Sequence, residues 1–352
     1  MGGLYILGAR QRNLLLRKEE EWNLYESALI LHLDTSTGEV RICVEYKSPP
    51  EATANDHSSS IFKSGTLIGD ILYTCTSTEV LIFKLPEFTQ MARISLPCFN
   101  DLHHVTPGPD GNLLVANTGL DMVIKLTPQG EVLDEWSVLD EDPWARFSRA
   151  IDYRKVDSTK PHQSHPNFVF QLNSEIWVTR FRQRDAICLN GRRRRIEIGE
   201  QFPHDGLLRG NRIYFTTVDG KIVIVNRQTL QVDEIIDLRS ISNGETMLGW
   251  CRGLLPVDER KVWAGFTRVR KTKFAENILW ARSILRDGVR EKRTHIALYD
   301  IGEKRCLQKC DLEQHGMNIV FSIFPAAPAT PELGTPSAGA STVSELPAGQ
   351  IL

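Results

Sequence analysis

The sequence predicts an all-β protein, a six-bladed β-propeller that is closed by strands from both ends of the chain. Three observations predict this fold. Short runs of β-branched and aromatic residues alternate with polar ones between Gly, Asp, Asn and Pro turns, and helical periodicity is almost absent. Similar units recur at a spacing of about 40 residues, which is typical of propeller blades. Strands left over at the two ends of the chain complete one more blade.

The repeat is clearest over residues 102–138. This unit holds an inner strand, a turn at 109–111, two further strands, a turn at Gly130 and an outer strand. Comparable units begin at four other places in the chain, namely Phe62, Ser164, Pro203 and Gly249. The last of these is interrupted and resumes near residue 294. The repeats therefore predict five blades.

The remaining strands supply the sixth blade. One lies at 317–324, and three lie near the other end of the chain, at 4–10, 28–34 and 40–46. Exchanging strands in this way removes unpaired sheet edges and locks the ring. The segment VANTGLDMVIKLTPQGEVL, residues 115–133, resembles the blades of NHL and SMP-30-like propellers. That resemblance implies the architecture of a propeller and no particular reaction.

We expect one propeller domain over residues 1–325, with a helical insertion near 271–293 and a disordered tail over 326–352. No apolar run reaches the length of about 18 residues that a membrane span needs, and the first residues do not form a secretory signal. The seven scattered cysteines suit reduced thiols. We therefore expect a cytoplasmic protein, and a monomer. A net charge of −2 gives no reason to expect a nucleic acid or a membrane as partner.

Aligning the units places one residue from each blade at a single mouth of the central channel. These residues are Lys63, His104, His165, His204, Arg252 and His315. Asn167 competes with His165 for its position. Neutral imidazoles bind first-row metals, so the four histidines predict a divalent metal ion, zinc or iron. The alternative is that each is a packed turn histidine with its own hydrogen bonds.

The loops that follow the second strands at the same mouth are rich in arginine. Six arginines in three loops are the candidates, namely Arg10, Arg12, Arg180, Arg182, Arg268 and Arg270. Guanidinium groups bind carboxylate or phosphate with two hydrogen bonds, so this face predicts an anionic ligand. Asn117 lies in another of these loops and is a candidate to contact the ligand. The alternative is a solvated surface.

Two functions remain open. The first is a metal-dependent enzyme, a lyase or hydrolase, that acts on a small anionic molecule. The metal would polarise a carbonyl or activate a water, and Arg252, Lys63 and Asp205 would be the catalytic side chains. The second is a non-catalytic propeller that binds an anionic ligand or a protein partner through the same basic face.

Overall fold

The computed structural model describes residues 2–12, 25–54, 59–192, 194–242, 245, 247–268 and 292–326. The helical insertion predicted near 271–293 lies outside these residues except for its last two positions. The predicted tail lies outside them beyond Ala326, and so does Arg270. The described part of the chain contains no helix that is long and apolar enough to cross a membrane.

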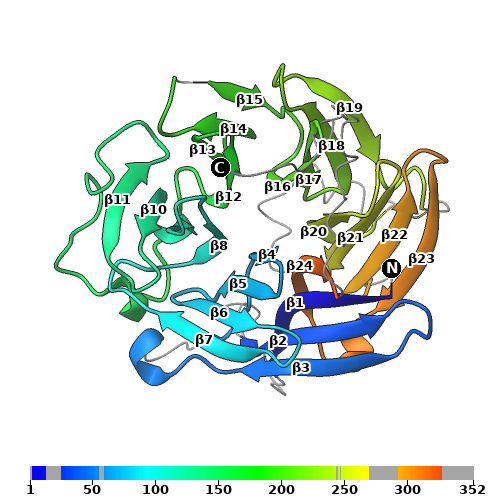
Figure 1. The fold of residues 1–352 in the computed structure, drawn as a ribbon, viewed down its shortest axis with the longest axis horizontal. Coiled ribbons are helices and arrows are strands. Elements are labelled where there is room, and N and C mark those ends of the chain that lie inside the picture. Colours follow the sequence, from blue (N-terminus) through cyan, green and yellow to red (C-terminus); the bar gives the residue numbers. More distant parts are fainter. Residues whose placement is uncertain are drawn as a thin grey trace, which may run out of the picture.

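Six four-stranded antiparallel sheets stand around a central channel, which confirms the predicted six-bladed propeller (Figure 1). Blade 1 contains β24 (Ile319–Pro325), β1 (Gly3–Gln11), β2 (Tyr25–Asp34) and β3 (Val40–Tyr46). Blade 2 contains β4 (Thr66–Ile68), β5 (Ile71–Cys75), β6 (Val80–Lys84) and β7 (Thr89–Ile94). Blade 3 contains β8 (Leu102–Pro107), β9 (Leu113–Asn117), β10 (Met122–Leu126) and β11 (Val132–Ser137).

The other three blades have the same strand order, from the channel outward. Blade 4 contains β12 (Pro166–Leu172), β13 (Glu175–Arg180), β14 (Asp185–Cys188) and β15 (Arg195–Glu197). Blade 5 contains β16 (Pro203–Arg209), β17 (Arg212–Thr217), β18 (Lys221–Asn226) and β19 (Val232–Asp237). Blade 6 contains β20 (Trp250–Pro256), β21 (Lys261–Thr267), β22 (His295–Asp300) and β23 (Arg305–Asp311). Short 3-10 turns lie at η2 (Pro50–Ala52), η3 (Thr118–Leu120), η4 (Tyr153–Lys155) and η6 (Glu313–His315).

The ring closes in blade 1 by the predicted strand exchange. Strand β24 pairs antiparallel with β1, from Leu4 opposite Pro325 to Ala9 opposite Ile319. Gly8 permits this pairing, because a Cβ atom there would lie 1.8 Å from the carbonyl oxygen of Ile319. No larger residue fits between two backbones that approach so closely.

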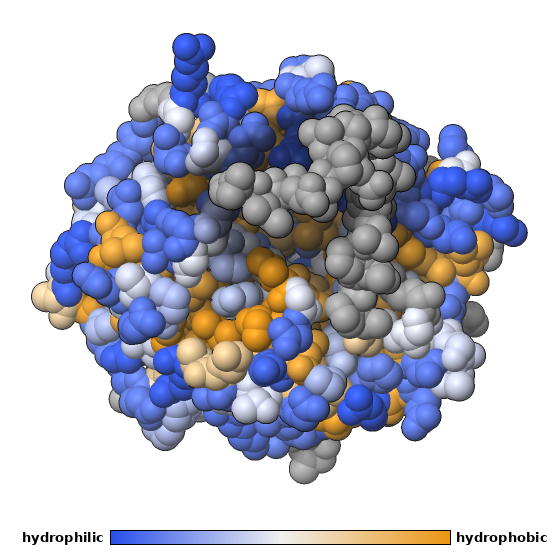
Figure 2. All heavy atoms as spheres, viewed as in Figure 1, coloured by the Kyte–Doolittle hydropathy of each residue, from blue (hydrophilic) through white to orange (hydrophobic). Residues whose placement is uncertain are grey.

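The hydrophobic core lies between neighbouring blades. Trp263 and Ile296 of blade 6, for example, pack with Leu4, Leu31 and Val320 of blade 1. On the face that Figure 2 shows, hydrophilic residues dominate the outer rim, and hydrophobic ones appear between them toward the centre. Both faces of a blade are covered by its neighbours, so its middle strands are apolar on both faces, and all five residues of β9 are buried.

A local irregularity recurs where the inner strands begin. In five blades the inner strand slips its pairing with the second strand near this end. The residues left unpaired are His103, Asn167, Asp205 with Gly206, Gly253 and Phe321. Such bulges re-aim side chains and are common beside functional sites. They determine which side chains reach the channel mouth.

Candidate metal centre at the channel mouth

Side chains from all six blades meet at the mouth where the inner strands begin. Contacts between non-neighbouring blades show that they reach across the channel. The ring centroids of His103 in blade 3 and Phe321 in blade 1 lie 6.0 Å apart, although blade 2 separates these blades in the ring. Those of Phe181, which follows β13, and Trp250 of blade 6 lie 6.1 Å apart across blade 5. The mouth is therefore one continuous polar and aromatic cluster.

Three side chains at this mouth form a possible metal-binding group. A carboxylate oxygen of Asp101 and one ring nitrogen each of His162 and His165 all lie within 4.8 Å of one another. The Nδ1 atoms of the two histidines are 2.8 Å apart, so one ring donates a hydrogen bond to the other. Nitrogens bound to one zinc ion at about 2.0–2.1 Å in tetrahedral geometry are separated by about 3.3 Å. The two rings therefore need to move apart only slightly for both nitrogens to bind one ion.

The tautomer of His162 follows from its other nitrogen. Its Nε2 lies 3.3 Å from the hydroxyl of Thr159, and that hydroxyl donates its own hydrogen to the carbonyl oxygen of Gly119. Nε2 of His162 therefore donates to Thr159, which leaves the lone pair of His162 on Nδ1, facing the cluster. A hydrogen bond of this kind is how proteins fix the orientation of a ligating imidazole.

The loop that carries the two histidines is held by one buried carboxylate. Asp121, at the end of η3, accepts hydrogen bonds from the backbone N–H groups of Gln163, Ser164 and His165 at 2.8, 3.0 and 2.7 Å. The guanidinium of Arg146 pairs with the same carboxylate at 3.0 Å. These bonds hold His165 in a left-handed conformation with φ of 62°. An irregular loop is thus held as firmly as a strand would be.

Asp101 is the carboxylate of the group, and Lys63 holds it ionised. The Lys63 ammonium lies 2.8 Å from Oδ1 of Asp101. Burial alone would raise the pKa of Asp101, but Lys63 and the surrounding imidazoles hold that pKa well below its usual range. His103 places its Nδ1 2.8 Å from the carbonyl oxygen of Asp101 and therefore donates to it. The lone pair of His103 is then on Nε2, which meets no hydrogen-bond partner among the described residues.

Arg252 provides a second cation at the mouth. Its Cζ atom lies 3.6 Å from the ring centroid of Phe321, and the Lys63 ammonium lies 5.1 Å from the same centroid. Nε of Arg252 donates to the carbonyl oxygen of Val320 at 2.9 Å. Within the described ranges, its two terminal nitrogens meet no acceptor and no carboxylate in ion-pair distance. Because a guanidinium pairs with planar oxyanions through these nitrogens, Arg252 is placed to bind an anion.

Asp205, predicted as a catalytic residue, lies in the bulge of β16. It is 4% exposed and accepts a hydrogen bond from the hydroxyl of Thr216 and from the backbone N–H groups of Gly253 and Leu254 in the next blade. Burial raises its pKa to about 6, although these bonds and the charge of Arg252 lower it. The geometry shows Asp205 joining blade 5 to blade 6.

His104, one of the four histidines predicted as metal ligands, does not reach the group. Nε2 of His104 donates to the carbonyl oxygen of Gly65 at 3.1 Å, and its Nδ1 accepts from the N–H of Val169 at 3.3 Å. Its ring stacks on Phe168 with centroids 3.6 Å apart, and burial lowers its pKa to about 3. The bulge before His104 causes this, because it turns His103 into the channel and His104 into the packing between blades.

His315 and His204 also lie outside the group. His315 lies on η6, half-exposed, with its Nε2 3.0 Å from the side-chain nitrogen of Gln314. His204 does lie at the mouth, where its ring centroid is 5.5 Å from that of Phe181. The metal group that the structure assembles contains neither. Of the four predicted ligands only His165 belongs to it, and Asn167, its competitor, instead donates to the carbonyl oxygen of Pro203 at 2.8 Å.

The predicted arginine face is largely neutralised by acidic neighbours. Arg10 pairs with Glu45, Arg180 with Asp185, and Arg268 with Glu313. Arg182 is exposed and Arg12 is half-exposed. Asn117 is fully buried, accepts from the N–H of Asn100 and donates to the carbonyl oxygen of Cys98, which is a structural role in its loop. The anion-binding potential of this mouth therefore rests on Arg252.

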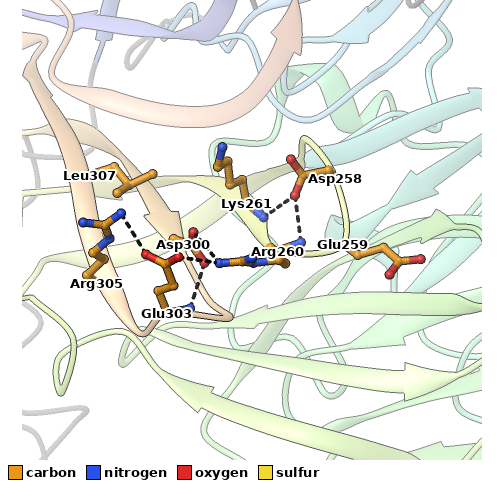
Figure 3. Close-up of a pocket in the computed structure, with 8 residues that line it drawn as sticks. All are labelled: Asp258, Glu259, Arg260, Lys261, Asp300, Glu303, Arg305 and Leu307. Atoms are coloured by element: carbon orange, nitrogen blue, oxygen red, sulfur yellow. Dashed lines mark hydrogen bonds and ion pairs between the residues drawn. The ribbon is translucent and has the colours of Figure 1, made fainter.

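A charged hollow lies at the end of blade 6 that is opposite the channel mouth. It has a volume of about 580 Å³ and is lined by charged residues of the β20–β21 and β22–β23 turns (Figure 3). Arg260 pairs there with Asp300 at 3.2 Å and with Glu303 at 2.8 Å, and Arg305 also pairs with Glu303 at 2.8 Å. These charges satisfy one another, so the hollow offers a ligand little.

Comparisons with known proteins define the fold. No protein-family model and no curated protein matches the chain. It is similar to a protein of unknown function from Bacteroides caccae, with a TM-score of 0.59 and 14% identity over 92% of this chain and 98% of that one. It is also similar to a streptogramin B lyase, with a TM-score of 0.46 and 12% identity over 88% of each chain. Virginiamycin B lyase from Staphylococcus aureus gives 0.42 and 14% over 67% of this chain and 70% of that one.

This likeness shows the fold alone. TM-scores of 0.46 and 0.42 are too low to carry the chemistry of the two lyases to this chain. One fold hosts many functions, so function has to be argued from the site.

Sequence reasoning missed Asp101 and His162, although signals for them were present. Asp101 directly precedes the inner strand of blade 3, in the run Asp-Leu-His-His. His162 and His165 form a His-x-x-His pair, a spacing that often brings two rings to one ion. His162 lies in the loop before β12, ahead of the repeat unit that begins at Ser164, so alignment of blades could not place it.

Proposed function

We propose that this chain is a divalent-metal-dependent enzyme of the lyase or hydrolase type, and that it acts on a small anionic substrate at the channel mouth. Asp101, His162 and His165 would hold the ion. The observation that carries the proposal is the approach of their three donor atoms to within 4.8 Å of one another. Two imidazoles and one carboxylate form a donor set that catalytic zinc and non-haem iron both use, with positions left for water and substrate.

The bound ion would polarise a carbonyl group or lower the pKa of a water molecule. Side chains of the protein would orient the substrate, keep Asp101 ionised and transfer a proton. Arg252 would orient the anion through its terminal nitrogens, and Lys63 would keep Asp101 ionised. His103, whose lone pair is on Nε2, would accept a proton from the substrate or from water. Each of these groups lies in the same cluster around Phe321.

The non-catalytic alternative predicted a broad basic face. It has less support, because Arg10, Arg180 and Arg268 are each paired with a carboxylate. A cytoplasmic, monomeric protein remains part of the proposal. All seven cysteines are free, which suits a reducing compartment.

Metal analysis tests the proposal directly. The full chain, purified without chelators, should contain about one equivalent of zinc or iron by elemental mass spectrometry, as one donor set implies. His162→Ala and His165→Ala should each lose the ion, because two protein ligands hold it far more weakly than three. His315→Ala is the matched control and should retain it. Absence of metal from the wild-type protein after incubation with zinc and with iron(II) would reject the proposal.

A further inference from the structure

Three half-buried aromatic rings form a wall beside the metal group. Phe181 and Phe202 are stacked with centroids 4.5 Å apart and planes inclined by 10°. Trp250 lies nearly parallel to Phe181, at 6.1 Å and 11°. His165, a member of the metal group, has its ring centroid 5.0 Å from that of Phe181. We define Phe181, Phe202 and Trp250 as the aromatic wall.

The aromatic wall is separate from the hydrophobic core between the blades. Among the described residues, none of its three rings belongs to a hydrophobic core cluster or packs against one. Structural aromatic residues of this protein behave differently. Trp177 and Phe215, for example, are fully buried inside the core between blades 4 and 5. Exposed aromatic surface gathered at a channel mouth is typical of a ligand site.

One ring of the aromatic wall, that of Trp250, lies on the same strand as the anion-binding Arg252. Trp250 and Arg252 are two residues apart on β20, before its bulge, and therefore project to the same side. The Trp250 ring lies beside Phe181 in the aromatic wall, and the Arg252 guanidinium lies over the ring of Phe321. The mouth thus has a flat apolar end and a cationic end. The metal group touches the first through His165, beside Phe181, and the second through Asp101, which pairs with Lys63.

We propose that the substrate is an aromatic carboxylate, in which a planar ring lies against Phe181 and Trp250 while its carboxylate meets the terminal nitrogens of Arg252. This inference rests on the proposed function, because it names the substrate class of the same site. A flat ring suits the wall, whose rings are parallel and offer π-faces. A sugar acid, the main competitor, needs several hydrogen-bond partners for its hydroxyl groups, and the wall supplies rings instead.

Calorimetric titration of the full chain tests the substrate class with four probes. We expect benzoate to bind at least tenfold more tightly than acetate, because its ring is removed from water. Cyclohexanecarboxylate should bind more weakly than benzoate, since it has no planar face, and glucuronate should resemble acetate. Equal affinity for benzoate and acetate would overturn the inference, and so would a preference for glucuronate.

Variants locate the binding. Trp250→Ala should weaken benzoate at least fivefold and leave acetate unchanged, whereas Arg252→Gln should weaken both. Trp144→Ala is the matched control and should change neither, because this half-buried tryptophan packs against Arg149 and donates to Glu135 of the outer strand β11. If Trp250→Ala leaves benzoate binding intact, the aromatic wall is not the subsite. Metal content measured on the same samples separates this failure from a failure of the metal site.

Discussion

The channel mouth and the charged hollow at the opposite end of blade 6 use similar residue types in different ways. In the hollow, Arg260 is exposed and pairs with two carboxylates, Asp300 and Glu303. At the mouth, Lys63 is buried with one carboxylate, and Arg252 has none within ion-pair distance among the described residues. Surface ion pairs contribute little to stability, while buried charges cost free energy unless they are paired. A cluster that retains such a cost is a candidate for function.

The comparison predicts its largest effect at Lys63. Lys63→Met should lower the free energy of unfolding by about 3–5 kcal/mol, because it leaves the carboxylate of Asp101 without its cation in a mostly buried site. Urea unfolding of the full chain with a chelator present measures this without a contribution from bound metal. The double variant Lys63→Met with Asp101→Asn should recover much of the loss. A single variant as stable as wild type would show that the pair is solvated.

A second effect is expected in the pH dependence of stability. Asp205 has its pKa raised by burial to about 6, against 3.8 for the unfolded chain. Between these two values the folded state binds more protons than the unfolded state. Asp205 therefore favours folding most below about pH 4, and this contribution is lost as the pH rises through 6. It amounts to roughly 2–3 kcal/mol between the two limits.

The Asp205→Asn variant isolates this contribution. Asn resembles the protonated acid, since it keeps one acceptor for Thr216 and cannot ionise. The difference in unfolding free energy between Asp205→Asn and wild type should therefore shift in favour of the variant from pH 4 to pH 7. Urea titrations at both pH values measure it. A difference that is constant with pH would show that Asp205 is already ionised below pH 4.

The fold was predictable because five blades repeat in the sequence, and the strands left over near the two ends of the chain make up the sixth blade. The site was predictable only in part. Alignment placed Lys63, His204 and Arg252 at the mouth, because they start inner strands in a regular register. It misplaced His104 by one position, since a bulge of one residue leaves no mark in the alternation of polar and apolar residues. The bonds of Asp121 to the loop of His165 join residues more than 40 apart and could not be seen in sequence.

For the arginine face, the prediction identified the positively charged residues but overlooked the carboxylates that pair with them. Asp185 follows Arg180 closely in sequence and neutralises it from the facing strand. Glu313 neutralises Arg268 from a segment 45 residues away. The number of arginines in a loop therefore overstates the positive electrostatic potential at the channel mouth, because the carboxylates that pair with them come from neighbouring strands and distant segments.

The smallest expected effect is at the hollow, and it tests the comparison from the other side. Arg260→Met, the same type of substitution as Lys63→Met, should lower the free energy of unfolding far less than Lys63→Met does, because Arg260 is itself exposed, Glu303 keeps Arg305, and the buried Asp300 still accepts the backbone N–H of Glu303. The small loss should shrink further when the salt concentration rises from 0.1 to 1 M, since exposed pairs are screened. Urea unfolding at the two salt concentrations measures both. A loss as large as that of Lys63→Met would mean that the hollow also holds its charges against a desolvation cost, and the distinction between the two regions would fail.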